Sequence, residues 1–140
     1  MGLYFNSGNA SFYNAVNSRI YVDKTRLLEY TNSILDTEQR LVCVSRPRRF
    51  GKTLTADMLT AYYCKGCNSQ SIFADLYISK SEGYLKNLNQ YHVIHVDIND
   101  FLHRIDSNTM RRVSPMDAIT IMQREILQEM QEYYSRDYQN

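Results

Sequence analysis

The expected fold follows from the stretch Ser45-Arg46-Pro47-Arg48-Arg49-Phe50-Gly51-Lys52-Thr53, which has the composition of a phosphate-binding loop. Residues 41–45, at its start, are mostly apolar and rich in β-branched side chains, as in a buried strand. Residues 53–63, which continue from it, place Leu54 and Met58 on one helix face. Strand, tight loop and helix in this order are the context that a phosphate-binding loop requires.

The residue types in this loop suit separate tasks in holding a phosphate. Gly51 lets the backbone approach the anion and take up dihedral angles that a Cβ would penalise. The free N–H groups around residues 50–53 open the helix and point at the anion. Lys52 reaches the β- and γ-phosphates as a point charge, and the Thr53 hydroxyl serves as a ligand for Mg²⁺. The loop therefore predicts a nucleotide site.

The loop departs from the usual pattern G-x-x-x-x-G-K-[ST] at its first glycine, where the chain has Arg46. Pro47 has no N–H to donate, so the anion-binding amides are expected from Arg48 onward. Arg48 and Arg49 offer planar, bidentate donors to phosphate beside Lys52. The alternative for the two arginines is a structural role, in which they hold a carboxylate at the sheet edge or remain in solvent.

In these motifs the chain resembles the bacterial AAA-ATPase-like family, whose Walker A element reads R-P-R-R-F-G-K-[ST] and accepts Arg in place of the first glycine. The upstream block Tyr21-Val22-Asp23-Lys24-Thr25 resembles a second motif of the family. The resemblance implies ATP and Mg²⁺ as ligands and ATP hydrolysis as the family's reaction. It assigns nucleotide binding, with Lys52 also catalytic, to Arg48, Arg49, Phe50, Gly51, Lys52, Thr53 and Leu54.

The resemblance runs from about Phe12 to the last residue and implies that the chain is the amino-terminal part of a larger protein. Family members continue into a strand with an acidic Walker B pair, and many carry a C-terminal nuclease-like domain. We therefore expect a single, truncated P-loop domain over residues 1–140 that binds ATP better than it hydrolyses it. The resemblance assigns any contact with nucleic acid to the missing C-terminal region and is compatible with an oligomer.

Residues 91–98 form the second segment with the pattern of a strand. Two strands joined by a long helical connection imply parallel pairing with a right-handed crossover. The expected fold class is therefore α/β, with a P-loop NTPase-like partial parallel sheet flanked by helices in three α/β/α layers. Ligands of such sheets lie at the carboxyl ends of the strands, which places residues 46–53 and 97–100 at one edge.

Asp97, near the end of the second segment, has two interpretations. As part of a Walker B strand, its carboxylate would hold Mg²⁺ through water. As the end of an ordinary strand, it would hydrogen-bond to a neighbouring turn. The resemblance favours the second interpretation, because the family's acidic pair lies beyond residue 140. Asp97 is therefore a secondary metal candidate beside Thr53.

Composition and charge narrow the class of protein. The chain has 16 Lys and Arg residues against 15 Asp and Glu residues, so its overall charge does not indicate a nucleic-acid or membrane partner. Three arginines and one lysine, with no acidic residue, lie between residues 41 and 53 and concentrate positive charge at the loop. No apolar run reaches the length of a membrane span and the start lacks a signal peptide, which predicts a cytoplasmic protein without membrane contact.

Local signals predict several further features. Helices are expected over residues 24–35, after the cap Asp23, and from Pro115 onward, after the cap Ser114. Gly66 is expected to end the helix that follows the loop. Residues 1–11 are polar and are expected to be poorly ordered or loosely docked.

Two other functions remain open on the sequence. One is a P-loop kinase that moves a phosphoryl group to a small acceptor. The other is a non-catalytic module in which the arginine-rich loop meets nucleic acid or an acidic protein partner. A nucleotide site should require Mg²⁺ and prefer triphosphate to monophosphate, whereas binding to a phosphate backbone should weaken steeply with salt.

Overall fold

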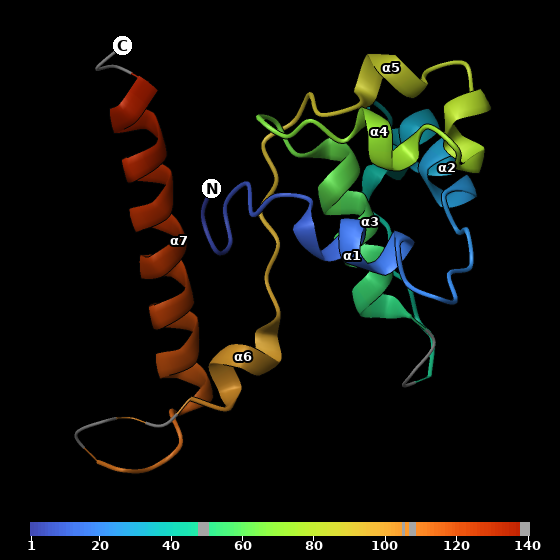
Figure 1. Ribbon diagram of the computed structural model, residues 1–140. Helices are drawn as coiled ribbons and strands as arrows, with labels where there is room; N and C mark the ends of the chain where they lie inside the picture. Colours follow the sequence, from blue (N-terminus) through green and yellow to red (C-terminus); the bar gives the residue numbers. More distant parts are fainter. Residues whose placement is uncertain (48–50, 105, 107–108, 138–140) are drawn as a thin grey trace.

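The computed structural model describes residues 1–47, 51–104, 106 and 109–137. Figure 1 shows helices α1 to α5 gathered in one body, with α7 standing beside it and α6 near one end of α7. The helices and 3₁₀ turns follow in chain order as α1 (Ala10–Val16), α2 (Arg26–Ile34), η1 (Glu38–Arg40), α3 (Lys52–Tyr63), α4 (Gln70–Phe73), η2 (Tyr77–Lys80), α5 (Tyr84–Asn87), α6 (Ile98–Leu102) and α7 (Pro115–Asp137).

The expected α/β class, with a partial parallel sheet in three layers, is wrong for this structure, because the described residues contain no β-strand. Residues 41–45 are exposed and belong to no helix or strand, and Leu41 is 87% exposed. A strand requires a neighbour at hydrogen-bonding distance as well as a suitable sequence. Residues 41–45 have the suitable sequence but, among the described residues, not the neighbouring segment.

The second expected strand meets the N-terminal segment instead of a parallel partner. Its His95 N–H donates to the Tyr4 carbonyl oxygen at 2.9 Å, and the Asn6 N–H donates to the Val93 carbonyl oxygen at 2.8 Å. The Asn6 side chain also accepts a 2.9 Å hydrogen bond from the Val93 N–H. Tyr4 and Asn6 are buried, so the expectation that residues 1–11 are poorly ordered or loosely docked is wrong.

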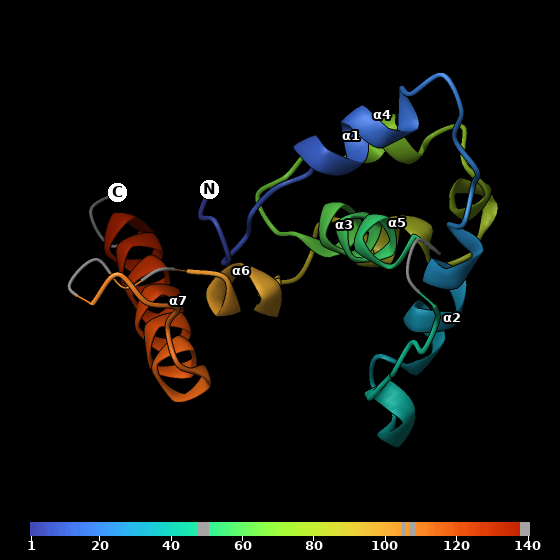
Figure 2. The ribbon, with the colours of Figure 1, turned by 90° about the horizontal axis from the view of Figure 1, so that it is seen from below.

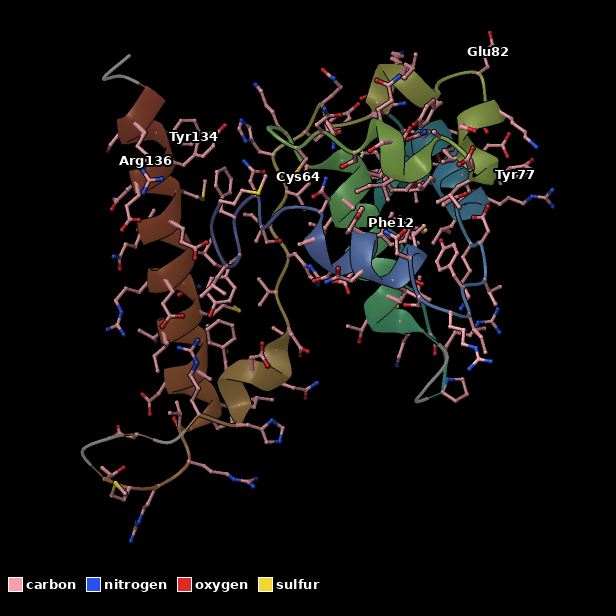
Figure 3. All side chains as sticks on the ribbon, in the orientation of Figure 1. Phe12, Cys64, Tyr77, Glu82, Tyr134 and Arg136 are labelled. Carbon is pink, nitrogen blue, oxygen red and sulfur yellow. The ribbon has the colours of Figure 1, made fainter. Side chains whose placement is uncertain are left out.

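Helix α3 lies at the centre of the larger hydrophobic core. In Figure 2, α1 and α4 lie to one side of α3, and α2 lies to another. Figure 3 labels Phe12 within this body, where its ring stacks on Phe73 with the centroids 5.0 Å apart. The fully buried apolar side chains of this core are Phe12, Leu28, Met58, Ala61, Tyr62, Phe73 and Ile78. Their burial holds α3, and therefore its N-terminal end, in a fixed position.

The local signals for helices are largely confirmed. Helix α3 covers the predicted range 53–63 and ends shortly before Gly66, whose φ is 87°. Helix α7 begins at Pro115, as predicted, and the Ser114 hydroxyl oxygen accepts a 3.2 Å hydrogen bond from the Asp117 N–H. These features depend on residues within one turn of each other, which is why sequence patterns predict them well.

Helix α7 is joined to the rest of the chain through a smaller core and a carboxylate. Tyr4, Phe101 and Ala118 form that core. The Glu129 carboxylate accepts hydrogen bonds from the backbone N–H groups of Leu3, Tyr4 and Phe5, at 2.7 to 2.9 Å. Within the described ranges, no helix combines the length and apolar character needed to cross a membrane.

Candidate functional site

The predicted loop enters α3 through Gly51, the N-cap residue of the helix, whose φ of 77° lies in the left-handed region that favours glycine. Thr55 donates its backbone N–H and its hydroxyl to the Gly51 carbonyl oxygen, each at 2.9 Å. The amides of Lys52, Thr53 and Leu54 therefore precede the first hydrogen bond of the α-helix. This is the end of a helix at which anions bind.

The side chains that follow Gly51 divide between solvent and core. Lys52 and Thr53 are exposed, so a ligand in solution can reach both. Leu54 is half-buried and packs against the larger core, which ties the first turn of α3 to the body of the protein. The remaining predicted nucleotide ligands, Arg48, Arg49 and Phe50, lie outside the described residues.

A lysine from another part of the chain lies against the loop. A Cβ added to Gly51 would lie 2.9 Å from the Lys24 Nζ atom. Lys24 belongs to the block 21–25, which carries part of the resemblance to the family. No residue of this block was predicted to belong to the nucleotide site. No spacing rule connects position 24 to position 51, so only the folded structure reveals their proximity.

The two neighbours of Lys24 are held by hydrogen bonds. The Asp23 carboxylate accepts from the Thr25 N–H at 2.8 Å, from the Thr25 hydroxyl at 2.7 Å and from the Tyr77 N–H at 2.7 Å. Burial acts to raise the pKa of Asp23, but these hydrogen bonds outweigh it and hold the pKa below its ordinary value. The prediction that Asp23 caps this helix is wrong, because Thr25 holds the N-cap position of α2, and the Thr25 side chain makes no capping hydrogen bond.

Asp97 lies beside a different cavity, of about 610 Å³. Its carboxylate accepts a 2.9 Å hydrogen bond from the Asn99 N–H and caps α6. Lys52 and Thr53 are not among the described residues that line the cavity. In the part of the chain that the structure describes, no group of three or more His, Cys, Asp or Glu side chains is arranged to hold a metal ion. The role of Asp97 as a Mg²⁺ ligand therefore stays a prediction.

The same cavity contains a histidine and an aspartate that sequence reasoning did not connect. His95 Nδ1 lies 3.2 Å from Thr60 Oγ1 and 3.9 Å from Asp57 Oδ1. Burial raises the pKa of Asp57, and nearby His95 opposes part of that increase. Asp57 lies on α3 and His95 on the segment that was expected to be a strand, so no local pattern could have paired them.

Comparison with known proteins gives one result on the family. The model of a protein family described as "Predicted AAA-ATPase" matches residues 8–139. The matched range includes both the loop that enters α3 and the block 21–25. The comparisons with curated proteins and with solved structures gave no match.

Proposed function

Since the chain belongs to the family described as Predicted AAA-ATPase, we propose that it binds ATP together with Mg²⁺ at the loop that opens α3. The observation that supports this proposal is the left-handed conformation of Gly51 directly before Lys52 and Thr53. This conformation presents the first-turn amides at the mouth of the helix, where an ammonium and a hydroxyl are also exposed.

The residues around Gly51 fit a polyphosphate group. A side chain at position 51 would enter the space between the backbone and the Lys24 ammonium, so the loop keeps a cradle that a Cβ would fill. The Lys24 ammonium lies at this space, and Lys52 with the first-turn amides of α3 follows Gly51 directly along the chain. This positive charge and these N–H donors suit an anion.

In the proposed complex, each residue has a separate task. The amides of residues 52–54 donate to phosphate oxygens, and the Lys52 ammonium balances their charge. The Thr53 hydroxyl would hold Mg²⁺, which when bound neutralises part of the phosphate charge. We propose that Arg48 and Arg49 add further charge at the same loop. Hydrolysis would also need a carboxylate that orients the metal and the attacking water, and hydrolysis is therefore not part of this proposal.

The experiment that tests the proposal is a calorimetric titration of ATP·Mg²⁺ into the wild-type protein and the Lys52→Ala variant. We expect Lys52→Ala to weaken binding by about tenfold or more, because the variant loses a charge-assisted contact to phosphate. Lys65→Met is the matched control, because it removes the same charge beyond the opposite end of α3, about 18 Å away along the helix. Equal affinity in the wild type and Lys52→Ala would refute the role of Lys52.

A second titration separates the proposal from the alternatives. A nucleotide site should need Mg²⁺ and should bind ATP more tightly than AMP. A nucleic-acid or acidic-peptide surface should bind without Mg²⁺ and should lose affinity steeply between low and moderate salt.

A further inference from the structure

We propose that Lys24 is a second cationic residue of the phosphate site, supplied by the segment before α2. This inference rests on the proposed function, because it assigns another residue to the same site. It starts from the observation that Lys24 Nζ would lie 2.9 Å from a Cβ added to Gly51. An ammonium group at this distance lies close to the turn that a bound phosphate would occupy.

The backbone on both sides of Lys24 is anchored to η2. The Asp23 carboxylate accepts a 2.7 Å hydrogen bond from the Tyr77 N–H, and the Thr25 hydroxyl accepts a 3.1 Å hydrogen bond from the Ile78 N–H. Thr25 is fully buried. Figure 3 labels Tyr77 on the side of the body that faces away from α7. The position from which Lys24 reaches the loop is therefore fixed, which reduces the entropy lost when its side chain binds a ligand.

The Lys24 ammonium, and not that of a neighbouring basic residue, lies at the loop. Apolar side chains share a small cavity with Lys24 and can cover its aliphatic stem. These apolar neighbours are Phe12, Tyr21, Val22, Leu54 and Met58. The next basic residue, Arg26, lies elsewhere, because its guanidinium carbon is 4.5 Å from the centre of the Tyr77 ring. Of these two cations, Lys24 is therefore the one at Gly51.

Two lysines from different elements can then act on one polyphosphate. Lys52 belongs to α3, whereas Lys24 precedes α2. Like charges near one turn repel each other, and a bound polyphosphate relieves that repulsion. The effect grows with the charge of the ligand, so Lys24 should matter most for ATP, less for ADP and least for AMP.

The test measures the affinities of ATP·Mg²⁺, ADP·Mg²⁺ and AMP for the wild type, Lys24→Met, Lys24→Arg, Lys52→Ala and Lys65→Met. Methionine keeps an unbranched stem and removes the charge, whereas arginine keeps the charge. We expect Lys24→Met to weaken ATP binding by about tenfold and AMP binding by less than about threefold. Lys24→Arg should recover most of the ATP affinity.

The outcomes distinguish this inference from the proposed function. If the wild type binds ATP, Lys52→Ala weakens binding and Lys24→Met does not, then the role of Lys24 is refuted while the nucleotide site stands. If the wild type binds no nucleotide, the proposed function is refuted, and the inference that rests on it is refuted as well. An equal loss of affinity for ATP and AMP in Lys24→Met would also overturn the inference, because it would indicate a structural role.

A measurement on the wild-type protein covers the case in which Lys24→Met does not fold. Acetylation of lysine amines is followed by mass spectrometry with and without ATP·Mg²⁺. Bound nucleotide should slow the acetylation of Lys24 and Lys52 several-fold and leave that of Lys65 unchanged. A Lys24 acetylation rate that does not respond to ATP, while that of Lys52 falls, would overturn the inference.

Discussion

The side-chain amide of Asn89 donates a 3.0 Å hydrogen bond to the carbonyl oxygen of Ala61, in the last turn of α3. The same amide also reaches the carbonyl oxygens of Tyr62, at 3.3 Å, and Cys64, at 3.0 Å. The Asn89 side-chain oxygen accepts a 2.9 Å hydrogen bond from the Ser69 N–H. One distant side chain therefore closes the end of the helix whose other end forms the candidate phosphate site.

Replacing Asn89 by glycine should destabilise the protein by about 1 kcal/mol, because the side-chain hydrogen bonds are lost while Ser69 Oγ still donates to the Ala61 carbonyl and the backbone N–H of residue 89 still donates to the Tyr62 carbonyl, each at 2.7 Å. Glycine is the informative substitution, since Asn89 has a φ of 57° that glycine adopts without strain. Urea unfolding gives the free-energy difference, and Asn68→Gly, at an exposed position, is the control. Equal stability of Asn89→Gly and the wild type would show that these hydrogen bonds contribute nothing.

Gly51→Ala should reduce both stability and ATP affinity, because alanine at a φ of 77° is strained by about 1–2 kcal/mol and its Cβ would lie 2.9 Å from Lys24 Nζ. Gly66→Ala is a matched control, since Gly66 has a φ of 87° but no atom within 4 Å of an added Cβ. Both variants should lose stability in thermal unfolding, and only Gly51→Ala should lose nucleotide affinity. Similar affinity losses in both would contradict a specific cradle at Gly51.

The ion pair between Arg104 and Glu125 should contribute to stability only above acidic pH. Arg104 donates a 2.6 Å hydrogen bond to Glu125, and this bond holds the pKa of Glu125 below its ordinary value of 4.5. A lowered pKa in the folded state means that the contribution is present above about pH 4.5 and is lost as the pH falls through the lower folded value. Both side chains are about one third exposed, so we expect the ion pair to contribute less than about 1 kcal/mol to the free energy of unfolding.

The measurement for this pair is the unfolding temperature of the wild type and Glu125→Gln across pH 3 to 7. The wild type should be the more stable at pH 7, and the difference should shrink toward pH 3. Glu82→Gln, at the exposed position labelled in Figure 3, is the control. A difference that does not change with pH would contradict an ionic contribution.

Asp57→Asn should leave the protein at least as stable as the wild type at pH 7. Burial raises the pKa of Asp57 above its ordinary value of 3.8, although nearby His95 opposes part of the increase. A raised pKa means that the folded state favours the protonated carboxyl, so stability is lost as the pH rises through the folded pKa. The asparagine side chain does not titrate. The difference in the free energy of unfolding between Asp57→Asn and the wild type should therefore shift in favour of Asp57→Asn from pH 3 to pH 7, as urea unfolding at several pH values would measure. A less stable Asp57→Asn at pH 7 would mean that the contact with His95 outweighs the burial of charge.

The elements that sequence patterns predicted correctly are those with local causes. Helix α3 follows from the periodicity of residues 53–63, and the start of α7 follows from Ser114 and Pro115. The two expected strands did not form. The apolar patterns at residues 41–45 and 91–98 do not indicate which segments lie beside them in the fold, so they could not predict whether a strand partner was present. The N-terminal residues, which looked too polar to pack, pair with Val93 and His95 instead.

The sequence by itself determined that a glycine able to adopt a left-handed φ precedes Lys52 and Thr53 at the start of a helix, because glycine chemistry and helix capping act over a few residues. The tertiary structure alone decided that Lys24 approaches Gly51. That contact joins segments far apart in the sequence, and the chain forms it because burying the core around α3 offsets the entropy lost in bringing those segments together.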